Sequence, residues 1–369
     1  MEERIKFFVG LDVDAQSIAV GVAEAGRAPA RARGSIAHDV AKLRKVLANY
    51  GDPQQVHVVY EAGPTGYGLQ RALTKYGYCC EVIAPSLIPK RAGDRIKTNR
   101  RDCLRLAELA RAGELTAVWV PDPGDEAIRD VARAREDAVK ARTQARHQLK
   151  AFLLRHGVHY AQRTSWTKTF YRWLATLHFD SAGAQTAFTE YWQAVSSAEE
   201  RVVRLTDALV RSIGAWRFEP VVKALQVLRG IDRISAIGLV SEIGDLHRFA
   251  HPRQLMAYLG LVPSQHSTGD RIVHGSITKT GNTHARRLLT EAAWNYRFRP
   301  RIGYDAQRRA ENLPQALRDL GWKAQLRLTG RYARLQARGL HKNKICVAIA
   351  RELAGFIWAI GTHEKVTHM

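Results

Sequence analysis

The sequence has few acidic residues, few cysteines and no long apolar run. No apolar stretch approaches the roughly 18 residues of a membrane span, and residues 1–6 carry acids where a secretory signal has a basic start and an apolar stretch. We therefore expect no membrane partner and a cytoplasmic location. The cysteines form no CxxC pair and no Cys/His zinc spacing, which predicts reduced, mostly buried thiols at Cys79, Cys80, Cys103 and Cys346.

The shortage of acids leaves the chain strongly positive. Its 369 residues contain 57 Lys and Arg against 35 Asp and Glu, a formal net charge of +22. Such an excess is typical of proteins that bind phosphate backbones and is rare among soluble metabolic enzymes. The apolar fraction of 46% is ample for one or more cores, and the length predicts two or three domains of roughly 150 residues each.

The first 122 residues alternate strand and helix patterns. Apolar runs predict strands at residues 7–13, 17–23, 31–36, 56–60 and 78–84. Helical spacing covers residues 38–50, 63–76 and 100–113, and Gly113 is the expected C-cap of the last helix. The order β-β-β-α-β-α-β predicts an α/β domain at 1–122, with a mixed sheet that begins with hairpins and continues with parallel crossovers.

Two further regions are expected to be mainly helical. Residues 123–220 are basic, and their helical stretches at 126–157 and 187–213 are interpreted as a long antiparallel pair, a dimer-forming coiled coil. Residues 221–362 are interpreted as a compact helical domain. It would contain a helix–tight turn–helix at 228–243, a helix that ends near Leu259, a helix that begins near His284 and a helix at 343–360. The polar segment at 263–282 is interpreted as a flexible loop.

Two acids stand at the ends of predicted strands. Asp12 ends the first strand in Gly-Leu-Asp-Val, and Glu61 ends the fourth in Val-Tyr-Glu-Ala-Gly. Carboxylates at the ends of strands meet at a shared sheet edge and require cations there, which predicts bound Mg²⁺ or Mn²⁺. Asp102 opens the following helix, with Asn99 on the same helical face. The alternative is that Asp12 and Glu61 are surface turn acids and that Asp102 caps a helix.

Six basic residues precede or adjoin Asp102 in the sequence: Lys90, Arg91, Arg95, Lys97, Arg100 and Arg101. Cations beside a carboxylate cluster suit an enzyme that holds a phosphodiester over metal ions. The alternative is a solvated run of charge.

The segment from 260 to 287 contains hydroxyl groups, glycines and cations. Ser267 and Thr268 precede Gly269, and a hydroxyl in such a loop is a candidate nucleophile for phosphoryl transfer. The cations that would neutralise the phosphate are Lys279, Arg286 and Arg287. The alternative is an ordinary polar loop.

Taken in order, these motifs resemble the transposases of insertion-sequence family 110, including its 1111 branch. Beside the motifs at Asp12 and Glu61, the family's Lys-Thr-Asp-x-x-Asp-Ala element is present as Lys-Thr-Asn-Arg-Arg-Asp-Cys at 97–103. The C-terminal half is similar through Leu-Arg-Gly-Ile at 228–231, residues 249–259, Gly-Leu-Val-Pro at 260–263 and Lys-Thr-Gly-Asn at 279–282. No single motif is decisive, but their joint order and spacing are specific and cover essentially the whole chain.

The resemblance implies a RuvC-like domain of the RNase H fold with a four-residue acidic signature. Asp12, Glu61 and Asp102 match three of the four positions, and the third acid of the family is Asn99 here. An amide oxygen can still bind Mg²⁺, but the change removes one negative charge from the set. Asn99 is therefore expected to be a weak metal ligand or none.

The resemblance also implies a catalytic serine immediately before the loop glycine. That place is occupied by Thr268, with Ser267 one residue upstream. Position favours Thr268, whereas chemistry favours Ser267, because a primary alcohol attacks phosphate with less crowding than a β-branched one. We place Ser267 slightly ahead and expect one of the two to be the nucleophile.

The implied activity is DNA recombination through a covalent protein–DNA phosphoester and a junction-like intermediate. The implied partners are donor DNA, target DNA, a structured non-coding guide RNA and a second copy of the chain, with dimers pairing into tetramers. The protein would act in a prokaryotic cytoplasm, associated with the nucleoid. The sequence contains no helix-turn-helix or zinc module that would read bases directly, which agrees with an RNA guide.

Two other functions are consistent with the residues. A stand-alone nuclease or junction resolvase would use the acids alone in a two-metal hydrolysis. A nucleic-acid-binding protein with weakened or no catalysis would account for Asn99.

Overall fold

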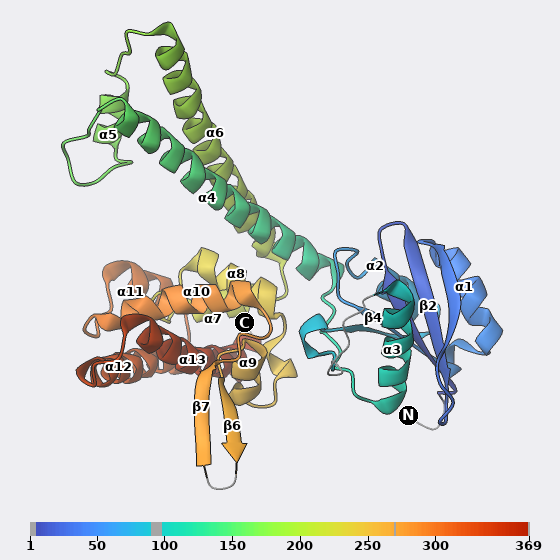
Figure 1. The fold of residues 1–369 in the computed structure, drawn as a ribbon. Helices are drawn as coiled ribbons and strands as arrows, with labels where there is room; N and C mark the ends of the chain where they lie inside the picture. The colour runs from blue at the N-terminus through green and yellow to red at the C-terminus, as the bar shows by residue number, and fades with distance from the viewer. Residues whose placement is uncertain (1–4, 90–97, 269–270, 368–369) are drawn as a thin grey trace. The chain divides into compact units, whose positions relative to one another are not determined.

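The computed structural model describes residues 5–89, 98–268 and 271–367, and the chain separates into two compact units (Figure 1). Unit 1 spans Met1–Val120 and unit 2 spans Pro121–Met369. Within the described residues, no helix combines the length and apolar character that crossing a membrane requires.

Unit 1 is built on a five-stranded mixed sheet with the strand order β3-β2-β1-β4-β5. The first three strands are antiparallel neighbours, whereas β4 runs parallel to β1 and β5 runs parallel to β4. This is the arrangement that the sequence predicts. The strands are β1 (Phe7–Val13), β2 (Ser17–Glu24), β3 (Arg31–Ala37), β4 (Val56–Glu61) and β5 (Cys79–Ile83).

Helices cover both faces of this sheet. Helices α1 (Val40–Leu47) and α2 (Gly68–Lys75) bury Leu43, Leu47, Leu69 and Leu73 in a core with Val9, Leu11, Val58 and Tyr60. Helix α3 (Asn99–Ala112) packs on the other face, where Leu106 and Ala110 contact Val59 and Ile83. Because side chains alternate along a strand, residues 8, 10 and 12 of β1 point toward the face that α3 covers.

Two glycines let α3 approach the sheet closely. A Cβ on Gly10 would collide with the carbonyl oxygen of Cys103, and a Cβ on Gly21 would lie 2.7 Å from the carbonyl carbon of the same residue. Gly10 and Gly21 are direct partners in the β1–β2 ladder. The paired glycines therefore form a floor on which the first half of α3 rests.

Unit 2 begins with a long antiparallel helical hairpin of α4 (Pro123–Arg155) and α6 (Ala182–Ser212), which lie side by side (Figure 1). Arg146 of α4 binds Glu199 of α6, and Tyr171 also donates to Glu199. The short helix α5 (Lys168–Leu174) lies at the far end, where Phe152, Phe170 and Phe188 form an aromatic core.

The rest of unit 2 is a helical bundle with one β-hairpin. Its helices are α7 (Glu219–Leu225), α8 (Arg233–Ile243), α9 (Pro252–Tyr258), α10 (Thr283–Ala293), α11 (Tyr304–Ala310), α12 (Gln315–Ala337), α13 (Lys342–Gly361) and α14 (Glu364–Thr367). The hairpin consists of β6 (Pro263–Thr268) and β7 (Arg271–Ile277). Short 3₁₀ turns cover 48–50, 53–55, 85–87, 213–215, 246–248 and 294–297.

Three local features differ from the sequence prediction. The segment interpreted as a flexible loop contains the β6–β7 hairpin; its polar strands lack the apolar run that signals a strand. Helix α2 begins at Gly68 rather than 63, because Gly66 has a positive φ of 67° and its carbonyl accepts a hydrogen bond from the Tyr60 hydroxyl. Helices α5, α11 and α12 carry no prediction from the sequence.

Candidate functional site

The two strand-end acids lie on neighbouring strands of unit 1. In the parallel β1–β4 ladder, Leu11 pairs with Tyr60, so Asp12 and Glu61 each come directly after this pair, at the carboxyl ends of the strands. Both acids point to the α3 face, because Gly10 and Val59 do so two residues earlier. The structure therefore brings Asp12 and Glu61 to one edge and one face of the sheet.

The N-terminal end of α3 arrives at the same place. Burial and then the negative charge of Asp12 raise the pKa of Cys103 to about 11, with a smaller contribution from Asp102. The backbone of Cys103 lies against Gly10, two residues before Asp12, so the start of α3 meets the end of β1. Asp102 occupies the first turn of α3, where the unpaired amides of a helix favour an acid, and Thr98 caps the helix by accepting from the Arg101 amide.

Asn99 has a partner that the sequence analysis missed. Its Nδ2 atom donates a hydrogen bond of 2.8 Å to Oδ2 of Asp14, which follows β1. The amide thus bridges the start of α3 and the end of β1, and its Oδ1 atom is the oxygen left for a cation. Asp14 lies two residues beyond Asp12 in the sequence, and that spacing was the available signal.

The chemistry of these oxygens suits a hard divalent cation. Carboxylate and amide oxygens are the ligands that Mg²⁺ takes in proteins. Within 5–89, 98–268 and 271–367, however, no three His, Cys, Asp or Glu side chains are grouped closely enough to hold a metal ion. The oxygens at this edge are of the type that binds Mg²⁺, but the side chains that carry them are not grouped closely enough to surround an ion.

Of the basic residues near the acids, Arg100 and Arg101 are exposed on the first turn of α3. Lys90, Arg91, Arg95 and Lys97 lie outside the described residues. These two arginines are therefore exposed to solvent beside the acidic edge of the sheet.

Ser267 and Thr268 lie at the end of β6 in unit 2. Nε2 of Gln265 donates a hydrogen bond of 2.7 Å to Oγ of Ser267, so the two exposed side chains share one face of the hairpin. The backbone of Thr268 pairs with Arg271, and its side chain lies outside what the structure describes. Ser267 is thus a hydroxyl held in place on a strand. The overlooked signal for the hairpin was Gly269-Asp270, a pair of residues typical of two-residue hairpin turns.

The Gly-Leu-Val-Pro and Lys-Thr-Gly-Asn motifs form the base of this hairpin. Gly281 has a φ of 71°, and a Cβ there would collide with the carbonyl oxygen of Tyr258. Lys279 also has a positive φ, of 56°, and its amide donates to the carbonyl of Gly260. The guanidinium of Arg286 binds the carbonyls of residues 259, 279 and 280, and burial lowers its pKa. Arg286 therefore holds the backbone of the hairpin base.

The helix that follows contacts the helical hairpin through Glu136 of α4. Nη2 of Arg287 lies 2.8 Å from Glu136, and Nε2 of His284 lies 2.7 Å from the same carboxylate. Asn282 caps α10 and donates through Nδ2 to Glu242, a bond of 2.6 Å. Of the predicted phosphate-binding cations in this unit, Lys279 has an exposed side chain, whereas Arg286 and Arg287 have partners within the protein.

Two family models match the chain. Residues 9–157 match a transposase model of the DEDD type from IS110 elements, and residues 222–305 match the model described as "Transposase IS116/IS110/IS902 family". The chain is also 46% identical, over 98% of its own length and 90% of the relative's, to the protein named "Putative transposase y4qE" of Sinorhizobium fredii. The chain belongs to the IS110 family of transposases. The family assignment made from the motifs is thereby confirmed.

Other relatives span most of the transposase. The transposase for insertion sequence element IS1533 of Leptospira borgpetersenii is 29% identical over 90% of this chain and 97% of its own length. The transposase for IS1111A of Coxiella burnetii is 26% identical over 84% of this chain and 78% of its own. The first family model covers the acidic edge and the second covers the β6–β7 hairpin, so both candidate groups of residues lie inside matched regions.

The transposase therefore carries two groups of candidate residues, one in each unit. Asp12, Glu61 and Asp102 belong to unit 1, and Ser267 belongs to unit 2. Outside these groups, Glu242 is a buried charge that the sequence analysis did not single out. Its place in the apolar stretch of α8, where a carboxylate needs a partner, was the available signal.

Proposed function

We propose that the transposase cuts and rejoins DNA through a covalent bond to Ser267. The Ser267 oxygen attacks a backbone phosphorus, the bond to the 3′ oxygen breaks, and the serine proton is transferred to that leaving oxygen. The products are a phosphoserine ester of DNA and a free 3′-hydroxyl. Attack of another strand's 3′-hydroxyl on the ester then restores the serine and exchanges the strands. The observation that carries this proposal is the 2.7 Å hydrogen bond from Gln265 to Ser267 Oγ.

That hydrogen bond favours Ser267 over Thr268 as the nucleophile. Because the Gln265 amide donates to Oγ, it engages a lone pair of the oxygen and leaves the hydroxyl proton directed elsewhere. A strand also holds the serine more rigidly than the loop expected from the sequence, which reduces the cost of positioning it. Lys279, at the base of the hairpin, is proposed to bind the phosphate, with Arg287 in support and Arg286 acting through the backbone that it holds.

The acids of unit 1 are proposed to form the second part of the site. Asp12, Glu61 and Asp102 would hold a divalent ion, Mg²⁺ or Mn²⁺, with Asn99 as a weak ligand. Such an ion supplies positive charge that stabilises the phosphorane-like transition state. Arg100, Arg101 and Lys97 would bind the neighbouring phosphates and so keep the DNA backbone beside the acids. The strand order of the sheet supports a RuvC-like assignment for this unit.

The proposal also includes further nucleic-acid and protein partners. A net charge of +22 supports binding to nucleic acid in general, and the family resemblance is what implies a structured guide RNA in addition to donor and target DNA. The helical hairpin of α4 and α6 is the proposed dimer element, a coiled coil, and dimers would pair into tetramers so that units of different copies complete each site. The proposed site of action is the nucleoid.

A trapping experiment tests the nucleophile. The full-length transposase, together with the nucleic acid that co-purifies with it from cells carrying its native flanking DNA, is incubated with Mg²⁺ and a labelled DNA carrying a nick beside the cut, so that the cleaved fragment diffuses away. We expect a labelled protein–DNA band on denaturing gels for wild type and for Thr268→Ala, and none for Ser267→Ala. An adduct in Ser267→Ala that disappears in Thr268→Ala would reassign the nucleophile. Cleavage without any adduct in all three proteins would favour the resolvase-like hydrolysis.

The guide is tested separately. The transposase is purified from cells that carry its native flanking DNA, and co-purifying nucleic acid is sequenced with and without RNase. One discrete RNA is the expected result. Heterogeneous or DNase-sensitive material at several salt concentrations would contradict the guide and favour recognition by protein alone.

A further inference from the structure

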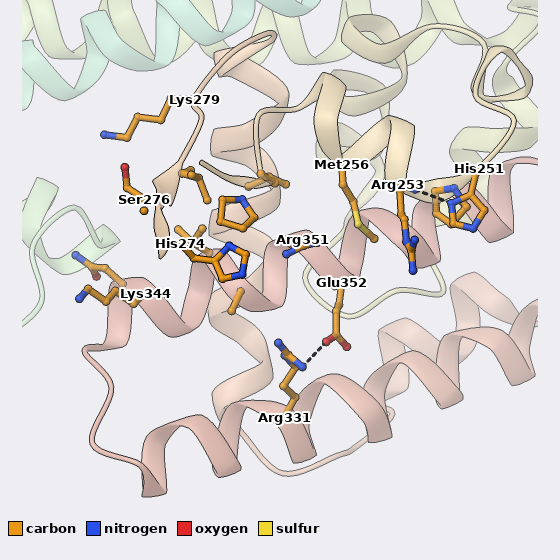
Figure 2. A pocket seen from close by; sticks show the side chains of 18 residues that line it. His251, Arg253, Met256, His274, Ser276, Lys279, Arg331, Lys344, Arg351 and Glu352 are labelled. Carbon is orange, nitrogen blue, oxygen red and sulfur yellow. Dashed lines mark hydrogen bonds and ion pairs between the residues drawn. The ribbon is translucent and has the colours of Figure 1, made fainter. Parts of the chain in front are cut away.

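A cavity of about 990 Å³ opens beside the serine hairpin. Figure 2 shows it between strand β7, helix α9 and helix α13, with Arg331 of α12 below. Its volume lies at the upper end of the roughly 300–1,000 Å³ found for small-molecule pockets. A pocket of this size accepts one or two nucleotides but not a base-paired duplex.

Part of the cavity lining is apolar. Met256 of α9, Leu261, Ile277 of β7, and Val347 and Ala348 of α13 contribute to its lining. Met256 is only partly buried and points into the cavity from above in Figure 2. Apolar side chains offer an unstacked base a surface on which to bury the faces that it exposes on leaving the strand.

The rim of the cavity is cationic. Arg253, Lys279, Lys344 and Arg351 contribute four positive charges to the lining. The described lining residues include one carboxylate, Glu352, and two arginines bind it: Nε of Arg327 at 2.9 Å and Nη1 of Arg331 at 2.8 Å. The carboxylate is therefore neutralised by its own partners, and the four cations leave the described lining with a net positive charge. The charge of the site is complementary to a phosphodiester.

The cavity lies on the same face of the hairpin as Ser267. His274 of β7 lines the cavity and is the direct partner of Gln265 in the ladder. Residues opposite each other in an antiparallel pair project to the same side, and Gln265 shares that side with Ser267, to which it donates. Ser267 pairs with residue 272, two positions nearer the tip, which places it about 7 Å along the strand from the cavity wall.

We propose that this cavity holds an unpaired DNA nucleotide adjacent to the phosphate that Ser267 attacks. The base would rest on Met256, Val347 and Ala348, and the flanking phosphates would bind Lys344 and Arg351. The inference rests on the proposed function for the choice of DNA, because the strand that passes Ser267 is the one being cut. The preference for an unpaired nucleotide rests on the shape and lining of the cavity alone. When one nucleotide of the strand is bound in the cavity, the phosphate next to it is the one placed beside Ser267.

Fluorescence anisotropy with full-length transposase tests the site. The probes are a labelled single-stranded oligodeoxynucleotide of about eight nucleotides, within the usual footprint of single-strand sites, a duplex of the same sequence and the matching oligoribonucleotide. Ala348→Leu narrows the apolar part of the cavity without changing charge or adding an aromatic ring, and it should weaken single-stranded DNA binding about tenfold, because the base then loses apolar contact. Duplex binding should stay within about twofold, since backbone contacts elsewhere supply it.

A charge variant gives an independent readout if the filled variant folds poorly. Lys344→Gln combined with Arg351→Gln should lower the slope of log affinity against log salt by about 1.4, at roughly 0.7 for each single-strand phosphate that is no longer neutralised. The matched controls are Ala337→Leu and Lys323→Gln, which make the same kinds of change at exposed positions of α12 that do not line this cavity. Both controls should bind like wild type, and thermal unfolding reports that each variant is folded.

Three outcomes would overturn the proposal. Equal losses of affinity for single-stranded and duplex DNA would mean that the cavity does not select unpaired nucleotides. Unchanged affinity in both pocket variants would mean that it binds no nucleic acid. A loss confined to the RNA probe would assign the cavity to RNA instead of the cut strand. Ser267→Ala separates this inference from the catalytic one: it should retain wild-type binding of the single strand while it forms no covalent adduct.

Discussion

Arg133 of α4 donates two hydrogen bonds, of 2.7 and 2.9 Å, to the carboxylate of Glu242 on α8. The Glu242 side chain is 2% exposed, whereas that of Arg133 is 51% exposed. Asn282, the N-cap of α10, donates to the same carboxylate. One buried charge thus joins the long helical hairpin, the bundle and the Lys-Thr-Gly-Asn turn at the base of the serine hairpin.

Removing Arg133 should therefore destabilise unit 2. Arg133→Ala leaves the buried carboxylate without its main partner, and we expect the free energy of unfolding to fall by about 3 kcal/mol, the lower end for a broken buried pair because Arg133 is half exposed. Lys140→Ala removes the ion pairs that this exposed lysine makes with Glu136 and Asp137 on the same helix and should leave the free energy of unfolding nearly unchanged. Urea unfolding followed by tryptophan fluorescence measures both. Equal losses of stability would contradict a special role for Glu242.

The same carboxylate should make unit 2 sensitive to acid. Burial pushes the pKa of Glu242 upward, but hydrogen bonds from Arg133 and Asn282 outweigh it and hold the pKa below its ordinary value. His284 lies 4.0 Å away on α10 and also favours the charged form. A lowered pKa contributes stability that is present above the unfolded pKa, about 4.3, and is lost as the pH falls through the folded pKa.

Urea unfolding at a series of pH values from about 7 down to 3.5 measures this dependence, on either side of the ordinary glutamate pKa. Glu242→Gln should be less stable than wild type at neutral pH and should lose less of its remaining stability on acidification. Parallel curves for the two proteins would show that other carboxylates cause the acid sensitivity.

The close approach of α3 to the sheet predicts opposite effects for two identical substitutions in unit 1. Gly10→Ala would drive a Cβ into the Cys103 carbonyl and should cost about 2–3 kcal/mol by overpacking. Gly68→Ala, at the start of α2, meets nothing within 4 Å and should stabilise by about 0.5 kcal/mol through a less flexible unfolded chain. Hydrogen exchange of β1 and α3 peptides reports the local stability. Similar exchange in both variants would refute the packing of α3 on Gly10.

Each acid of the sheet edge should be required for cleavage but not for folding. Asp12→Asn, Glu61→Gln and Asp102→Asn remove charge that a divalent ion needs, and we expect cleavage to fall by more than about a hundredfold, as for other electrostatic stabilisers that are removed. Glu114→Gln changes an exposed acid just beyond α3 and should cleave like wild type. A DNA cleavage assay titrated with Mg²⁺ measures the effect, with circular dichroism as the folding control. Normal cleavage by Asp12→Asn would exclude it from the site.

Restoring an acid at Asn99 should strengthen the response to metal. Asn99→Asp replaces a hydrogen bond to Asp14 by two facing carboxylates, so without Mg²⁺ the variant should be less stable by under about 1 kcal/mol. Added Mg²⁺ should raise its melting temperature more than that of wild type, because an ion that binds only the folded state stabilises it. In the double variant Asn99→Asp/Asp14→Asn, the amide and the carboxylate exchange places and the stability without metal should return. An unchanged Mg²⁺ response would remove position 99 from the metal set.

The fold of unit 1 could largely be predicted from local sequence patterns. The strands around Val9 and Val58 are apolar runs of a length that only a buried strand explains, and Gly113 ends α3 in the left-handed conformation expected of a C-cap. The β6–β7 hairpin of unit 2 could not be predicted from local patterns. Its strands are largely polar and derive their stability from pairing and from a base clamped by Arg286, and neither is visible as periodicity.

The same distinction between local pattern and tertiary structure applies to the candidate site. The chain's order of residues alone determined which groups are available: a positive chain, acids at the ends of two strands, a serine and a threonine before a glycine, and motifs in the order of one transposase family. Tertiary structure decided what each group faces. Asp12 and Glu61 share a face because of the β1–β4 register, Asn99 is bound to Asp14 across 85 positions, and Arg286 is committed to backbone carbonyls. Register and side-chain facing arise from pairing between distant segments, and a shift of one residue reverses them, so no local pattern encodes them.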